Sequence, residues 1–155
     1  MREPSCCLAE PPGFSPGEHQ LGANVVVLGA LDSSLNINEN HFKKILKVSG
    51  DLEITFHKAI DETNLIKSIN TLNKYPQITN VLTSGGKGDI ANNIPFINEM
   101  CEEASNLKIL LGGGLNFKNI ENLKENTSNC DFHFGTAVRH DSNPFKKLMK
   151  RNSLN

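Results

Sequence analysis

The feature that most constrains this chain is a repeat of short apolar runs, each of which ends in polar residues or glycine. The runs begin at positions 25, 53, 80, 108 and 131, so successive starts lie 28, 27, 28 and 23 residues apart. Strands at this interval, separated by helical segments, are typical of βα units with parallel strands. The repeat therefore predicts an α/β chain with about five βα units and a parallel sheet.

The segments between these runs have the periodicity of amphipathic helices. Apolar residues recur every three or four positions around Phe42, Ile69 and Met100, with polar residues between them. The fourth helix is short, and Asn116 is its predicted N-cap. Met100 and its neighbour Cys101 fall on an apolar face, so we interpret both as core residues.

Two of the predicted strands are apolar at every position. These are Val25–Leu28 and Ile109–Leu111, which contain only valine, isoleucine and leucine. Continuous apolar strands of this kind are typical of parallel sheets that are covered on both faces. We therefore expect both strands to be buried on both sides.

The composition changes abruptly near residue 22. Four of the seven prolines lie in the first 16 residues, whereas every lysine and asparagine follows residue 23. Residues 1–21 have few apolar groups and no periodicity, which predicts a disordered tail. The region 22–140 contains the βα repeat. The basic segment 141–155 is predicted to be a tail or a frayed helix over Phe145–Arg151.

The charge and cysteine content argue against several functional classes. The formal net charge is −1, so no bulk field attracts the chain to nucleic acid or to an anionic membrane. No apolar run approaches the ~20 residues of a membrane span, and the N-terminus has no signal-peptide core. We therefore expect a cytoplasmic protein. The four cysteines lack zinc-like spacing, although the adjacent Cys6 and Cys7 could hold a soft metal.

Two histidines stand where predicted strands end. His57 and His133 occupy these positions, and Asp61 follows His57 by four residues. Ligands bind at the C-terminal strand ends of barrels and open parallel sheets, and histidine suits proton transfer or metal ligation. We therefore predict His57, Asp61 and His133 as candidate catalytic residues. The alternative is that each histidine bonds a backbone carbonyl and that Asp61 caps the next helix.

Hydroxyl groups and glycines follow two further strands. Glycine permits turns that present backbone N–H groups to an anion, and loops late in a (β/α)8 barrel often bind phosphate in this way. A tight turn would need the same glycines, so the signal is weak for each glycine alone. The predicted site for phosphate or another anion comprises Thr83, Ser84, Gly85, Gly86, Gly112, Gly113 and Gly114.

Five segments together resemble the CutC copper homeostasis family. In chain order they are Val26–Leu31 (VVLGAL), Ile54–Asp61 (ITFHKAID), Val81–Gly86 (VLTSGG), Leu110–Ile120 (LLGGGLNFKNI) and Asp131–Ala137 (DFHFGTA). Their order and spacing match the second part of such proteins, and the resemblance covers about residues 21–140. It implies part of a (β/α)8 barrel of the TIM type, a site at the C-terminal strand ends and a role in copper handling.

The chain departs from the family pattern before Asn24. Family members begin with three further βα units, which carry an acidic-leucine-cysteine motif and an arginine-proline-arginine motif, and neither motif is found here. The metal ligands are therefore unknown, and Cu(I) is implied by the resemblance alone. Any copper binding is expected to be weak and to depend on Cys6 and Cys7. The partial barrel is also expected to be only marginally stable, so that it aggregates, is partly molten or associates with another copy through its strand edges.

The resulting hypothesis is a cytoplasmic copper homeostasis protein that binds Cu(I). The principal alternative is a small-molecule enzyme of the TIM-barrel type, with an anion site and acid–base chemistry at its histidines. A third interpretation is an inactive fragment of a longer barrel. The sequence does not decide whether the chain is an enzyme.

Overall fold

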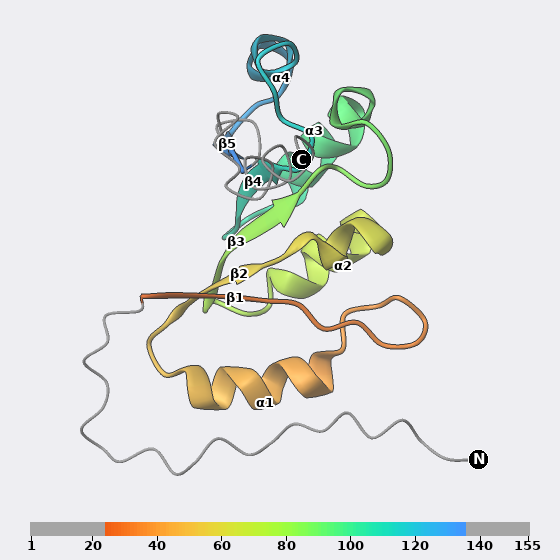
Figure 1. Cartoon of the computed structure of the whole chain (residues 1–155). Helices are drawn as coiled ribbons and strands as arrows, with labels where there is room; N and C mark the ends of the chain where they lie inside the picture. The colour runs from red at the N-terminus through yellow and green to blue at the C-terminus, as the bar shows by residue number, and fades with distance from the viewer. Residues whose placement is uncertain (1–23, 136–155) are drawn as a thin grey trace, which may run out of the picture.

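A computed structural model describes residues 24–135, which form five strands that alternate with helices (Figure 1). The strands are β1 (Val25–Leu28), β2 (Glu53–Phe56), β3 (Ile78–Thr83), β4 (Lys108–Gly112) and β5 (Cys130–His133). The α-helices are α1 (Glu39–Ser49), α2 (Leu65–Leu72), α3 (Ile94–Glu103) and α4 (Ile120–Asn126). Two short 3-10 helices, η1 (Lys58–Glu62) and η2 (Ile90–Asn93), follow β2 and precede α3.

Local sequence signals explain where the helices begin. Asn38 caps α1, because its side chain accepts a hydrogen bond from the His41 backbone N–H, and Asn64 caps α2 in the same way. Proline in the first turn of α3 costs little, because the N–H that it lacks would have no partner inside the helix. α4 begins at Ile120, so the prediction that Asn116 is its N-cap was wrong. Asn116 instead accepts hydrogen bonds from Lys118 and Asn119 in the preceding turn.

The five strands are parallel and follow one another in the order β1-β2-β3-β4-β5. The predicted α/β class with about five parallel βα units is confirmed. The third strand starts at Ile78 and the last at Cys130, rather than at 80 and 131. Ile78 belongs to the sheet because it pairs with Ile54 of β2.

The core lies between the sheet and the helices. Phe42 from α1 packs edge-on against Phe56 of β2 and Tyr75, while Ile69 of α2 and Met100 of α3 are fully buried. Burying each side chain of this size contributes about 1.5–3 kcal/mol. The core assignment of Met100 is therefore correct.

Burial differs between the two strands that were predicted to be covered on both faces. In β4 the side chains of Ile109 and Leu111, which share one face, are buried as expected, whereas Leu110 on the other face is only partly buried. In β1, Val25 is 46% and Val27 is 60% exposed among the described residues, so that expectation was wrong there. β1 has one strand neighbour in the described sheet, and no helix of this part covers the exposed positions.

Several predictions concern residues outside the described range. The tail over residues 1–21, the segment 141–155 with its helix over Phe145–Arg151, and the Cys6–Cys7 pair all belong there. β1 and β5 are the edge strands of the described sheet, and each is followed or preceded in the chain by one of these segments. Association with another copy through these edges therefore stays a prediction. Across the described helices, none is long and apolar enough to span a bilayer.

Candidate functional site

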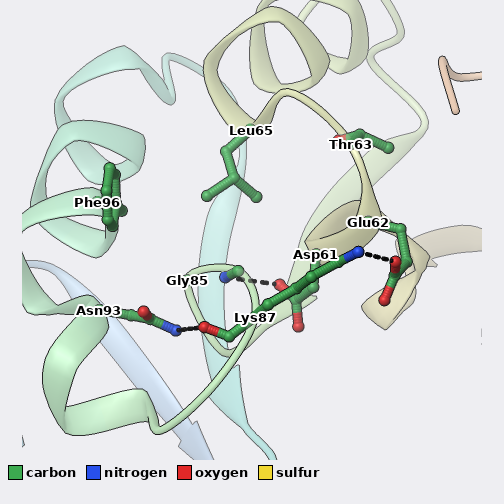
Figure 2. A pocket seen from close by; sticks show the side chains of 9 residues that line it. Asp61, Glu62, Thr63, Leu65, Gly85, Lys87, Asn93 and Phe96 are labelled. Carbon is green, nitrogen blue, oxygen red and sulfur yellow. Dashed lines mark hydrogen bonds and ion pairs between the residues drawn. The ribbon is translucent and has the colours of Figure 1, made fainter.

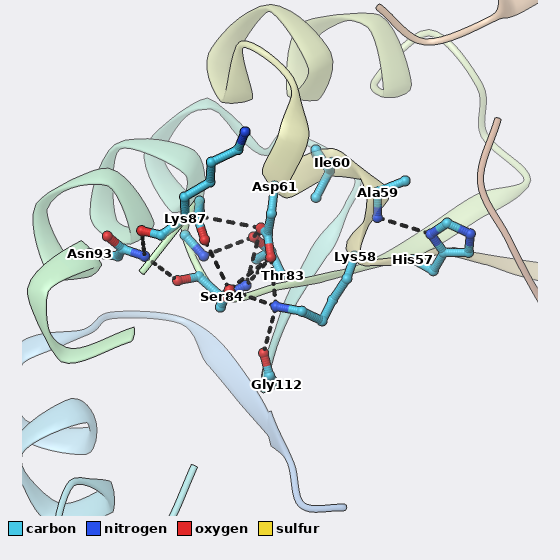
Figure 3. A network of polar contacts seen from close by, with 12 residues as sticks. His57, Lys58, Ala59, Ile60, Asp61, Thr83, Ser84, Lys87, Asn93 and Gly112 are labelled. Carbon is cyan, nitrogen blue, oxygen red and sulfur yellow. Dashed lines mark hydrogen bonds and ion pairs between the residues drawn. The ribbon is translucent and has the colours of Figure 1, made fainter. Parts of the chain in front are cut away.

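The C-terminal ends of β2, β3 and β4 meet in a polar network centred on the carboxylate of Asp61 (Figure 3). Asp61 lies in η1 and is only 8% exposed. Its carboxylate accepts hydrogen bonds from the Thr83 hydroxyl, from Ser84 Oγ at 2.8 Å and from the Gly86 backbone N–H at 3.2 Å. The Ser84 backbone N–H adds bonds of 3.2 and 3.1 Å to the two carboxylate oxygens. Asp61 therefore anchors the end of β3 to η1.

Lys58 extends this network to a third strand. Its Nζ lies 2.7 Å from Asp61 Oδ2, 2.6 Å from Ser84 Oγ and 3.4 Å from the Gly112 carbonyl oxygen at the end of β4. The Lys58 side chain as a whole is 43% exposed. Its ammonium group has these three protein acceptors, so Lys58 joins η1 to the ends of β3 and β4.

The turn after β3 needs glycine because of both its backbone angles and its packing. Gly85 and Gly86 have φ values of 75° and 111°, in the left-handed region that glycine tolerates best. A Cβ atom on Gly85 would also lie 2.6 Å from Cγ1 of Ile97. Asn93 holds the turn from the other side, since its Nδ2 donates to the carbonyl oxygens of Ser84 and Lys87 at 2.9 and 3.2 Å.

The charge state of Asp61 follows from competing effects. Burial raises the pKa of the carboxyl, but the Lys58 ammonium and the hydrogen bonds from Thr83 and Ser84 stabilise the ionised form. The net effect is a pKa below the ordinary value, so Asp61 is a carboxylate at neutral pH.

This geometry bears directly on the predicted anion site. The donors of Thr83, Ser84 and Gly86 already bond the carboxylate of Asp61, so an internal anion occupies the cradle that they form. Gly113 and Gly114 differ, because they are exposed and have φ values of 88° and 83°. A Cβ on Gly113 would lie 2.9 Å from Lys58 Nζ, which places the ammonium group beside this open turn.

The two histidines lie apart and in different surroundings. His57 caps η1, with its Nδ1 accepting a hydrogen bond from the Ala59 backbone N–H at 3.0 Å, and its ring packs over Gly29. His133 is exposed and pairs in register with Gly112. β3 and β4 lie between β2 and β5 in the sheet, so the two histidines belong to strand ends that are not neighbours.

A cleft of about 290 Å³ lies beside the network (Figure 2). Asp61 and the Gly85 turn line one part of it, and the side chains of Leu65 and Phe96 line another. Lys87 Nζ contacts Glu62 Oε2 at 2.8 Å across the exposed side. The cleft therefore combines two apolar side chains with several polar and charged ones.

Two features of the structure were missed in the sequence. Lys58 was not among the residues assigned to the site, yet it bonds residues 26 and 54 positions away in the chain. Asp61 was given helix capping as an alternative role, but Asn64 caps α2. The placement of Lys58 directly after a strand and three residues before an acidic group was the available signal.

The second missed feature is a pair of thiols. Cys101 was assigned to the core and Cys130 was given no role, but their Sγ atoms are 2.8 Å apart and both side chains are half-buried. Thiolates suit Cu(I), and these are the thiols of the described range. Residues 24–135 contain no cluster of three or more histidine, cysteine, aspartate or glutamate side chains that could hold a metal ion.

The parallel strands and the position of the network define a class of protein. Chains of this class have the βα-barrel type of fold and a polar site at the C-terminal ends of the strands. Comparison with known proteins makes the assignment specific. Residues 17–138 match the CutC family, so the chain belongs to the CutC family.

Individual relatives agree with this assignment. The copper homeostasis protein CutC homologue of Dictyostelium discoideum is 28% identical over 83% of this chain and 51% of its own length. The family protein CutC of Pasteurella multocida is 31% identical over 81% of this chain and 52% of its own length. The crystal structure of CutC from Streptococcus agalactiae superposes with a TM-score of 0.68 at 28% identity, covering 75% of this chain and 57% of that one. The chain thus spans about half the length of the curated relatives it matches.

Proposed function

We propose that this chain acts in copper homeostasis and binds Cu(I). The observation that carries the proposal is membership of the CutC family over residues 17–138, together with the copper homeostasis name of the Dictyostelium relative. The available soft donors support it, because thiolates are preferred Cu(I) ligands. They are the contacting pair Cys101 and Cys130 and, outside the described range, Cys6 and Cys7.

A Cu(I) competition titration against a chromophoric chelator tests this proposal. We expect the reduced full chain to take Cu(I) from a weak chelator, and a variant with all four cysteines replaced by serine to lose this ability. The double variants Cys6→Ser/Cys7→Ser and Cys101→Ser/Cys130→Ser assign the binding to one pair. We expect Cu(I) binding to depend on Cys6 and Cys7, so the first variant should lose it. Absence of Cu(I) binding by the wild-type chain would contradict the proposal.

A second candidate function is a small-molecule enzyme with an anion site, and the position of Lys58 favours it. The Lys58 ammonium lies between Asp61, Ser84 and the exposed turn at Gly113. A carboxylate or phosphate of a substrate could bind this ammonium and the backbone N–H groups of the turn. In this proposal Asp61 positions Lys58, while His57 and His133 would exchange protons with substrate from the two sides.

Amide chemical shifts test the anion site. We expect inorganic phosphate to shift the amides of Gly113 and Gly114 first, because those of Ser84 and Gly86 donate to Asp61. Lys58→Met should weaken phosphate binding, whereas Lys87→Met serves as the matched control, since Lys87 pairs with Glu62 instead. Equal shifts in both variants and the wild type would remove Lys58 from the site.

Location and assembly complete the proposed function. We place the chain in the cytoplasm, as its composition predicts, and expect a second copy to pair along a sheet edge. Sedimentation velocity over a range of concentrations tests the assembly, and a concentration-independent monomer would contradict it.

A further inference from the structure

A second group of reactive side chains lies away from the Asp61 network. Cys101 belongs to α3, and Cys130 is the first residue of β5, where it pairs in register with Ile109. The two Sγ atoms are 2.8 Å apart, about 0.8 Å more than the length of an S–S bond. Both thiols are free, and each is half-buried, so a small reagent can reach the pair.

We propose that Cys101 and Cys130 form a redox-active dithiol that is converted to an intramolecular disulfide by small-molecule disulfides of the glutathione type. The proposal is independent of copper binding, since it requires only the two thiols in contact.

The reaction balances as two exchange steps. The thiolate of one cysteine of the pair attacks one sulfur of the small disulfide RSSR, forming a mixed disulfide and releasing one thiolate RS⁻. The other cysteine then loses its proton to solvent and attacks the sulfur of the first, which releases the second RS⁻ and leaves the Cys101–Cys130 bond. The two cysteines are oxidised by two electrons, and RSSR is reduced by two.

The bond would link parts of the fold that are otherwise joined through β4. In the described sheet β5 pairs with β4 alone, and α4 lies between them in the chain. A covalent link from α3 to the first residue of β5 encloses β4 and α4 in one closed loop. Oxidation should therefore slow local opening of β5.

Peptide mapping by mass spectrometry tests the proposal on the full chain, with a chelator present to exclude metal. Cys6→Ser/Cys7→Ser provides a background in which only this pair remains. After treatment with glutathione disulfide, we expect loss of two hydrogen atoms, a peptide that links Cys101 to Cys130, and reversal by dithiothreitol. Amide exchange in β5 should slow by at least about tenfold after oxidation.

Single variants test the mixed-disulfide intermediate. In the same background, Cys101→Ser and Cys130→Ser should each accumulate glutathione on the remaining cysteine, because no second thiol is present to displace it. Circular dichroism of both variants confirms that they are folded. Failure to form the cross-linked peptide in a large excess of glutathione disulfide would overturn the proposal.

Discussion

The Asp61 network and the Cys101–Cys130 pair both join segments that are distant in sequence, but they do so with different numbers of partners. Asp61 accepts bonds from Lys58, Thr83, Ser84 and Gly86, so the loss of one leaves several others. The thiols depend chiefly on each other, so their chemical state changes with one reaction. The network therefore maintains one geometry, whereas the thiol pair can exist in two covalent states.

The largest expected effect comes from breaking the centre of the network. Asp61→Asn removes the charge that Lys58 and several donors stabilise, and it puts an amide N–H against them. We expect the free energy of unfolding to fall by about 3–5 kcal/mol, as is usual when one partner of a buried pair is removed. Urea unfolding measures this loss. The exposed neighbour gives a matched control, since Glu62→Gln should cost less than about 1 kcal/mol.

Oxidation of the thiol pair should act in the opposite direction. The bond would close a loop between residues 29 positions apart, for which the chain-entropy relation gives about 3–4 kcal/mol of stabilisation. Urea unfolding with and without dithiothreitol measures the difference in the Cys6→Ser/Cys7→Ser background. A reduced chain as stable as the oxidised one would show that the bond strains the fold.

Acid should destabilise the fold through the Asp61 network. The pKa of Asp61 is lowered in the folded state, so its contribution to stability is present above the unfolded pKa of about 3.9 and is lost as the pH falls through the folded value. We expect the urea midpoint of the wild-type chain to fall as the pH is lowered from 5, and the midpoint of Asp61→Asn to fall less. Parallel pH profiles for the two proteins would show that other carboxyls dominate.

The smallest effect is expected at Lys58. Lys58→Met removes the ammonium but leaves the hydroxyl and backbone donors of Asp61 in place. Because the lysine side chain is 43% exposed, solvent screening limits the loss to about 1 kcal/mol. A loss as large as that of Asp61→Asn would mean that the other donors do not compensate.

The parts of the fold that could be predicted are those that depend on residues close together in the sequence. The runs at Val25, Glu53 and Lys108 are bounded by polar residues or glycine, and strands begin at these positions. β3 starts two residues earlier than predicted. The polar residues Thr79 and Asn80 separate Ile78 from the apolar run, and only the pairing of Ile78 with Ile54 of β2 assigns it to the strand.

The candidate site was predictable in position but not in its internal contacts. The strand-end rule drew attention to His57, Asp61 and the glycine turns. It could not show that Lys58 reaches Gly112, since no local pattern encodes a bond across 54 residues. The same holds for Cys101 and Cys130, whose pairing follows from the register of β5 on β4. The burial of β1 was overpredicted because an apolar run does not specify its neighbours.

The sequential order of the five strands has a consequence for how the chain assembles. Each strand joins the one made just before it, so every step closes a loop of similar length, with 22 to 30 residues between successive strand starts. The entropy of loop closure grows only slowly with length, and it is therefore nearly the same at each addition. The sheet can consequently grow one βα unit at a time, with no step that must bring together residues from opposite ends of the described chain.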